Sequence, residues 1–300
     1  MHVVLGVGPA GTTLATELAT RGHQVRTVTR KEADLRDPEA ATRAIAGAEV
    51  VYHCVNVAYH LQVEAMPVLQ EAILTGVERA GARLVVLDTL YPYGPTGGAV
   101  MTEDTPWNAT GPKGRMRADL DRAYLEAHAA GRAGVVLGRS ADFYGPGVLN
   151  STLGGAVFPG ALTGETVLGL GDVDLPHSYT YIGDVARGLA LLGENPDADG
   201  RVWHLPTAPA RTTRQVFDLI AERAGRPLDV RVMAELAPWG PFDEVFVGEY
   251  REVFYQNQEP QIVDSSAFQE RFGVAPVDFE EGVDATLAWY RSAFAATAGE

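Results

Sequence analysis

The sequence is poor in cysteine and in positive charge. Its 300 residues contain one cysteine, Cys54, which excludes an internal disulfide and a cysteine-rich zinc site. Lys and Arg together number 24 against 39 Asp and Glu, which gives a net charge of −15. Nucleic acids and anionic membranes bind concentrated positive charge, so we expect neither as a partner.

Long apolar runs and metal-binding motifs are also missing. No stretch approaches the ~20 apolar residues that a membrane span needs, and the start of the chain lacks the basic and apolar parts of a secretory signal. The seven histidines are scattered, and none belongs to an HExxH pattern. We therefore expect a cytoplasmic protein without a catalytic metal, whose assembly into a homodimer is left open.

The sequence does contain a regular alternation of short β-branched runs and longer helical patterns. Strands that alternate with helices form parallel β-α-β units, so the pattern predicts an α/β fold with a Rossmann-type doubly wound parallel sheet. The predicted strands span 2–5, 24–29, 49–54, 83–87 and 135–137, and the predicted helices span 12–21, 38–45, 66–79 and 116–129.

The second half of the chain has a different pattern. Residues 145–176 are rich in Gly and Pro, and helical patterns return at 214–224 and 283–294. This predicts a smaller C-terminal α+β substrate domain. We assign 1–150 to a dinucleotide-binding Rossmann domain to which 178–208 contribute, and 151–177 and 209–300 to the substrate-binding domain.

A glycine motif follows the first predicted strand. Gly6-Val7-Gly8-Pro9-Ala10-Gly11 has the GxGxxG spacing. The first glycine allows a tight turn, the second lets the backbone approach a pyrophosphate, and the third permits close helix–strand packing. The N-terminus of the following helix supplies N–H groups to the phosphates. The alternative is a glycine turn that only packs. The predicted cofactor contacts here are Gly6, Gly8, Pro9, Ala10 and Gly11.

The end of the second predicted strand indicates which dinucleotide binds. An NAD site usually has an acidic residue there for the ribose 2′-hydroxyl, whereas this chain has Thr29-Arg30-Lys31. Cations suit a 2′-phosphate, so we expect NADP(H), with NAD as the alternative cofactor and a solvated surface as the alternative for the basic pair. Glu32 follows that pair and is expected to be a poor ribose ligand. Asp34 and Leu35 are placed near the adenine.

Five further segments follow the glycine motif in order, at 34–37, 51–56, 88–94, 139–147 and 181–186. With it they resemble the motifs of the short-chain dehydrogenase/reductase superfamily, in its extended, epimerase/dehydratase-like branch. The similarity covers nearly the whole chain. It implies an NAD(P)-dependent enzyme in which Val55, Asn56 and Asp142 contact the cofactor.

The resemblance breaks at the Tyr-x-x-x-Lys pair of these enzymes, in which the Tyr is the general acid/base. Lys113 stands in the place of the Tyr and Arg117 in the place of the Lys, while Thr89 keeps the hydroxyl of the family's Ser. This puts in doubt which group moves the proton.

The spacing of the two cations favours a joint role. Residues four apart project from the same helix face, and two cations on adjacent turns repel, which is expected to lower the pKa of Lys113. We predict that Lys113 donates the proton, that Arg117 holds the cofactor and that Thr89 binds a substrate carbonyl. The alternatives are that both cations only bind the cofactor or are solvated, and that Thr89 caps a turn.

Several other side chains are expected near the substrate. Tyr91, Tyr144, His177 and Tyr179 are candidates for substrate contact, with packing in the inter-domain cleft as the alternative. Tyr59 and His60 are expected to line the mouth of the site, and Cys54 is expected to be a small buried hydrophobe. The acidic residues of the C-terminal half are expected to form a solvated face: Glu235, Asp243, Glu244, Glu249 and Glu252.

Three functions remain open at this point. The first is an NADP(H)-dependent oxidoreductase that acts on a small carbonyl or conjugated substrate. The second is a catalytically silent redox sensor that binds a dinucleotide without turning it over. The third is a sugar-nucleotide epimerase or dehydratase, which is weakened because the acidic C-terminal half offers nothing to an anionic substrate.

Overall fold

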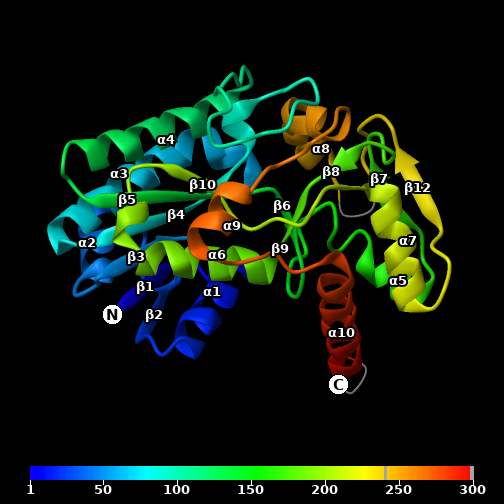
Figure 1. The fold of residues 1–300 in the computed structure, drawn as a ribbon, viewed down its shortest axis with the longest axis horizontal. Coiled ribbons are helices and arrows are strands. Elements are labelled where there is room, and N and C mark those ends of the chain that lie inside the picture. The colour runs from blue at the N-terminus through cyan, green and yellow to red at the C-terminus, as the bar shows by residue number, and fades with distance from the viewer. Residues whose placement is uncertain (240–241, 298–300) are drawn as a thin grey trace.

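A computed structural model describes residues 1–239 and 242–297 and shows the predicted α/β fold (Figure 1). Six parallel strands form one sheet in the order β2-β1-β3-β4-β5-β10. These strands are β1 His2–Leu5, β2 Val25–Val28, β3 Val50–His53, β4 Arg83–Thr89, β5 Gly134–Ser140 and β10 Val202–His204.

Helices cover both faces of this sheet, with α2, α3 and α4 on one side and α1 and α6 on the other (Figure 1). Successive strand residues point to opposite faces. Val3 and Leu5 therefore join the core under α2–α4, while Val4 joins the core under α1 and α6. These helices are α1 Pro9–Thr20, α2 Pro38–Ile45, α3 Gln62–Ala80, α4 Pro112–Ala129 and α6 Ile182–Glu194.

The starts of the helices follow their caps. At α2 the prediction is confirmed, because Asp37 Oδ1 accepts a hydrogen bond from Glu39 N at 3.1 Å and Pro38 occupies the first turn. Helix α1 begins at Pro9 and α4 at Pro112, each three or four residues earlier than predicted. The earlier start of α4 places Lys113 in its first turn.

The strand order places a crevice at the glycine motif. The usual Rossmann order is 3-2-1-4-5-6, with a strand outside the second one, whereas here β2 is the edge strand and residues 29–37 form a turn directly into α2. Ligands of such sheets bind beyond the carboxyl ends of the strands, where the order reverses. In this chain the reversal lies between β1 and β3, so Gly6 and Cys54 face one crevice.

Most of the remaining elements gather beyond one end of the sheet, whereas α9, Ser266–Phe272, packs beside β10 and the core under α1 and α6 (Figure 1). Strand pairs β6–β9, β7–β12 and β8–β11 form there, and a separate apolar cluster packs α5, α7 and α10. The division into domains stays a prediction. The elements are β6 Asp142–Tyr144, α5 Phe158–Thr163, β7 Val167–Leu170, β8 Pro176–His177, β9 Tyr179–Tyr181, β11 Arg211–Thr212, α7 Thr213–Ala224, β12 Val230–Met233, α8 Glu244–Tyr250, α9 Ser266–Phe272 and α10 Phe279–Thr297. Four short helices complete the fold: η1 Tyr59–Leu61, η2 Tyr91–Tyr93, η3 Pro196–Ala198 and η4 Arg251–Asn257.

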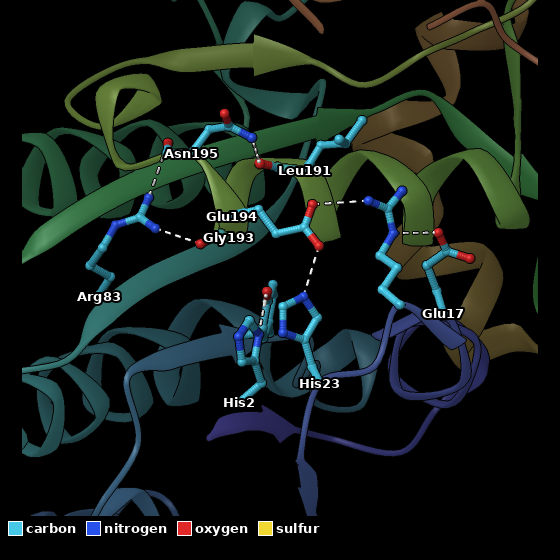
Figure 2. A network of polar contacts seen from close by, with 10 residues as sticks. His2, Glu17, His23, Arg83, Leu191, Gly193, Glu194 and Asn195 are labelled. Atoms are coloured by element: carbon cyan, nitrogen blue, oxygen red, sulfur yellow. Dashed lines mark hydrogen bonds and ion pairs between the residues drawn. The ribbon is translucent and has the colours of Figure 1, made fainter. Parts of the chain in front are cut away.

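A polar network ties the opposite, amino end of the sheet to the end of α6 (Figure 2). Glu194 accepts a hydrogen bond from Arg21 Nη1 at 2.9 Å and contacts His23 Nε2 at 2.8 Å. Next to them, His2 Nδ1 lies 2.9 Å from Tyr52 Oη, and burial together with His23 lowers the pKa of His2 to about 4. No helix within 1–239 and 242–297 is long and apolar enough to cross a membrane.

Candidate functional site

The glycine motif has the geometry of a dinucleotide loop. Gly6 has φ +91°, and a Cβ on Gly11 would lie 1.9 Å from the carbonyl oxygen of Gly6, so only glycine fits at both positions. A Cβ on Gly8 would meet nothing within 4 Å, and Gly8 caps the N-terminus of α1. The space beside Gly8 and the N-terminus of α1 is where a pyrophosphate is expected from the sequence, and that contact stays a prediction.

The end of β2 holds an acidic side chain that the sequence analysis dismissed. Glu32 Oε2 accepts hydrogen bonds from Thr29 N at 2.7 Å and Thr29 Oγ1 at 2.8 Å, and these bonds lower the pKa of Glu32. These hydrogen bonds place the Glu32 carboxylate at the end of β2, beside the exposed residues Arg30 and Lys31. The Thr-x-x-Glu spacing, which is that of a capping box, was the available signal.

Asp34 and Leu35, the two residues expected near the adenine, lie in different environments. Asp34 pairs with Arg36, at 2.9 Å to Nε and 2.8 Å to Nη2, and these hydrogen bonds lower the pKa of Asp34 to about 2. Leu35 is buried in the core under α2–α4. Asp34 is therefore available at the surface of the turn, whereas the side chain of Leu35 stabilises the sheet.

Arg117 reaches the crevice from α4. Its Nη2 donates to Asn56 Oδ1 at 3.3 Å, and the same oxygen accepts from Val57 N and Gln62 Nε2. Within the described residues, Arg117 Nε and Gln62 Oε1 are buried and have no hydrogen-bond partner. Buried polar atoms without partners are rare in folded proteins, so these two fit a site that a bound dinucleotide completes. Val55, beside Asn56, lies half-buried at the same edge.

Lys113 does not have the environment that the sequence predicts. Its side chain is 2% exposed, and its Nζ binds Glu249 Oε2 and, at 2.8 Å, Glu252 Oε1. Burial lowers the pKa of Lys113, but the hydrogen bonds to Glu249 and Glu252 outweigh it, so the net shift is upward. The expected lowering by Arg117 is wrong, because two carboxylates from α8 and η4 reach the ammonium.

Glu252 also binds the start of α4. Its Oε2 accepts a hydrogen bond from Lys113 N at 2.9 Å, so one carboxylate holds both the backbone and the side chain of Lys113. A negative charge is stabilised at a helix N-terminus. Glu249 and Glu252 were expected to lie on a solvated face, and for these two residues that expectation is wrong. They join α8 and η4 to the first turn of α4.

Two tyrosines meet above the end of β4. Tyr91 Oη lies 2.9 Å from Tyr59 Oη, and the ring of Tyr59 lies 4.7 Å from Lys113 Nζ and stacks on Phe246. Thr89 Oγ1 accepts a hydrogen bond from Tyr91 N at 3.4 Å, which agrees with its alternative role as a turn cap and leaves its own proton to donate. Tyr91 thus contacts Thr89 through its backbone and Tyr59 through its hydroxyl, near the residue that is expected to bind the substrate.

The other candidates fall into two groups. His177 Nε2 contacts Asp142 Oδ2 at 3.2 Å, so Asp142 lies near a substrate candidate rather than against the glycine motif. Tyr144 and Tyr179 are buried in the cluster of α5, α7 and α10, and Tyr179 Oη bonds Thr213 Oγ1 at 2.8 Å. This burial supports the packing alternative for both tyrosines.

Below the site lies a buried ionic triad. Arg139, fully buried, donates from Nε to Asp88 Oδ2 and from Nη2 to Asp121 Oδ2, both at 2.6 Å. Its guanidinium also lies 4.5 Å from the ring of Tyr93. The triad joins β4, α4 and β5, which carry Thr89, Arg117 and Ser140. Residues 1–239 and 242–297 contain no group of three or more His, Cys, Asp or Glu that could hold a metal.

Comparison with known proteins finds that the chain is similar to enzymes whose names include nucleotide sugars. A dTDP-4-dehydrorhamnose reductase of Mycobacterium tuberculosis strain H37Rv is 30% identical over 219 residues, which are 67% of this chain and 68% of that protein. Among solved structures, a dTDP-glucose 4,6-dehydratase from Streptomyces venezuelae with NAD bound superposes with a TM-score of 0.81 at 19% identity, over 97% of both chains. The UDP-glucose 4-epimerase of Thermus thermophilus, in complex with NAD, gives 0.77 at 22%, over 98% of this chain and 100% of that one.

These structural likenesses, at low identity, show the fold. The decisive match is with the NAD dependent epimerase/dehydratase family, which covers residues 2–205 and so includes the glycine motif, Thr89, Lys113, Arg117 and Asp142. That span confirms the resemblance to the extended branch and the implied class of an NAD(P)-dependent oxidoreductase- or epimerase-like enzyme. The chain belongs to the NAD-dependent epimerase/dehydratase family.

Proposed function

We propose that the protein is an NADP(H)-dependent oxidoreductase that reduces the carbonyl of a small substrate. The observation that carries this proposal is that Tyr91 is bonded to Thr89 at the end of β4 and is close enough to Arg117 for that cation to lower its pKa. A hydroxyl, a phenol and a buried guanidinium are groups that bind a carbonyl oxygen and a ribose. A silent redox sensor needs the cofactor-binding groups alone.

The residues present fit the cofactor. The turn at Gly8 and the N-terminus of α1 would hold the pyrophosphate, and Arg117 with Asn56 would hold the nicotinamide ribose. The bound cofactor supplies the hydride. What remains for this chain is to orient the carbonyl, exclude water and hold a proton near the carbonyl oxygen.

The substrate class is supported by charge. The relatives named above carry nucleotide sugars in their names, which keeps a sugar-nucleotide substrate as the second candidate. In this chain the side chains that face Lys113 are Glu249 and Glu252, and Asp142 lies near Tyr91. Glu249 and Glu252 neutralise the charge of Lys113, and Asp142 would repel a diphosphate, so we favour a small uncharged carbonyl substrate.

The test is turnover with defined substrates. The purified protein is mixed with NADPH and, in turn, with small aldehydes and ketones, quinones, and a dTDP-4-keto sugar, and the loss of NADPH absorbance is followed. We expect turnover with an uncharged carbonyl. Turnover with the nucleotide sugar alone would establish the second candidate. Tight NADPH binding without any turnover would establish the silent sensor.

The cofactor preference has its own prediction. Arg30 and Lys31 are exposed beside the end of β2, where a 2′-phosphate would lie. Replacing both by alanine should weaken NADPH binding about 10- to 100-fold and NADH binding at most a few-fold, since charge-assisted hydrogen bonds to phosphate are lost. A fluorescence titration with each dinucleotide measures this.

The matched control is Glu32→Gln, which keeps the basic pair. If Glu32 holds the ribose, that change weakens NADH binding more than NADPH binding, and the protein prefers NAD. Equal losses for both dinucleotides in the alanine double variant would also contradict the NADP preference.

A further inference from the structure

We propose that Tyr91 donates the proton in this reaction and so replaces the tyrosine that relatives carry on the helix that corresponds to α4. The inference rests on the proposed function and names a catalytic residue for it.

The position of Tyr91 is the first step. Tyr91 opens η2, two residues after Thr89, and its N–H is bonded to Thr89 Oγ1 at 3.4 Å. The turn packs directly on the first turn of α4, because a Cβ on Gly114 would lie 2.8 Å from the carbonyl oxygen of Tyr91. The phenol of Tyr91 therefore comes from a turn that adjoins the place from which the family's tyrosine projects.

The second step concerns Lys113, which occupies that family position. Its ammonium is bound by Glu249 and Glu252 and covered by the ring of Tyr59. A proton donor must reach the substrate oxygen. The N–H groups of the Lys113 ammonium already donate to two carboxylates. Lys113 fits an anchor for α8 and η4 better than it fits a donor.

Charged and phenolic groups from several elements surround the Tyr91 hydroxyl. Arg117 faces it from α4, Asp142 from β6, Tyr59 from η1, Tyr250 from α8, and Glu252 and Tyr255 from η4. Burial, then Asp142, raises the pKa of Tyr91 to about 12, with Arg117 acting in the opposite direction. Tyr91 is therefore a neutral phenol at pH 7, the form that can give a proton.

The proton that Tyr91 gives up is replaced from solvent. As hydride adds to the carbonyl carbon, the carbon–oxygen π pair moves to the oxygen, and the Tyr91 O–H bond breaks to protonate it. The cofactor is oxidised by two electrons and the carbonyl is reduced to an alcohol. The Tyr91 phenolate accepts a hydrogen bond from Tyr59 Oη, 2.9 Å away, and is then reprotonated from solvent.

A tyrosinate titration tests the assignment without any substrate. Oxidised nicotinamide carries a positive charge, so NADP⁺ should lower the pKa of a phenol beside it by about one unit. We expect ultraviolet tyrosinate absorbance of the wild type to appear at lower pH when NADP⁺ is bound, and this shift to be lost in Tyr91→Phe. The control variant Tyr124→Phe removes a different buried phenol, which lies on α4, and should keep the shift.

Turnover gives the second readout. With the carbonyl that the wild type reduces best, Tyr91→Phe should lower kcat about a hundredfold or more while NADPH affinity stays within about threefold, and Tyr59→Phe should lower kcat less. A kcat within about threefold of the wild type in Tyr91→Phe, or a titration shift that persists in it, overturns the inference. If no carbonyl is turned over, the proposed function fails, and the titration alone still decides whether Tyr91 lies beside the nicotinamide.

Discussion

Replacing Arg139 by methionine is expected to lower the free energy of unfolding by about 3–5 kcal/mol, because it strands two buried carboxylates. Arg139 is fully buried and binds Asp88 and Asp121 at 2.6 Å each. Burial, and then Asp88, already raises the pKa of Asp121. Urea unfolding of the variant, with an unchanged slope against denaturant, measures the loss.

The sign of the pH dependence identifies the cause. Burial raises the pKa of Asp121 and Arg139 lowers it, so without Arg139 the folded-state pKa of Asp121 lies further above its unfolded value and the folded state binds more protons between the two values. The Arg139→Met variant should therefore regain stability as pH falls from 7 to 5, relative to the wild type. A simple packing defect would cost the same at both pH values.

The matched control removes the stranded charges. Arg139→Met combined with Asp88→Asn and Asp121→Asn should recover most of the lost stability, since a buried ion group can be replaced by uncharged side chains at little net cost. If the triple variant is as unstable as the single one, the triad does not account for the loss.

The triad matters for function through the elements it joins. Asp88 precedes Thr89, Asp121 lies one turn of α4 after Arg117, and Arg139 lies on β5 shortly before Asp142. The same ion group therefore sets the spacing of three candidate site residues. Activity lost in Arg139→Met and regained in the triple variant would separate this positioning role from direct contact with substrate.

The fold was predictable because its signals are local. Alternation of β-branched runs with helical patterns, Asp37 before Pro38, and the glycine motif after the first strand each act within about a dozen residues. The early starts of α1 and α4 were also visible, in Pro9 and Pro112. The absence of a strand outside β2 could also be predicted, because the segment from Thr29 to Asp34 is long enough only for a short turn.

The site was less predictable because its partners are far apart in the sequence. Glu249 and Glu252 are 136 and 139 residues from Lys113, and no periodicity links them to α4. The lysine pKa was therefore inferred from Arg117 alone, four residues away, and its direction was wrong. The contact between Tyr59 and Tyr91 depends on how η1 and η2 meet above the sheet, which composition does not encode.

The anchor formed by Lys113, Glu249 and Glu252 is expected to behave as one unit. Lys113→Met removes the cation, and the double change Glu249→Gln with Glu252→Gln removes both carboxylates. Each should lower the free energy of unfolding by about 2–3 kcal/mol, less than a fully buried pair, since side chains of Glu249 and Glu252 are 34% and 20% exposed. Each should also speed proteolysis within α8 and η4.

Combining the changes distinguishes an anchor from a proton donor. Glu252→Gln keeps a side-chain oxygen that can accept from Lys113 N, so the triple variant should be about as stable as Lys113→Met alone, which is the signature of coupled side chains. Turnover should then fall equally in Lys113→Met and in the double glutamine variant, through loosened α8. If Lys113 donates the proton, Lys113→Met abolishes turnover, whereas the double glutamine variant keeps it and shifts its pH profile downward, because the amine loses the carboxylates that hold its pKa up. The two outcomes differ for the double glutamine variant. Comparing its turnover with that of Lys113→Met therefore decides whether Lys113 anchors α8 and η4 or donates the proton.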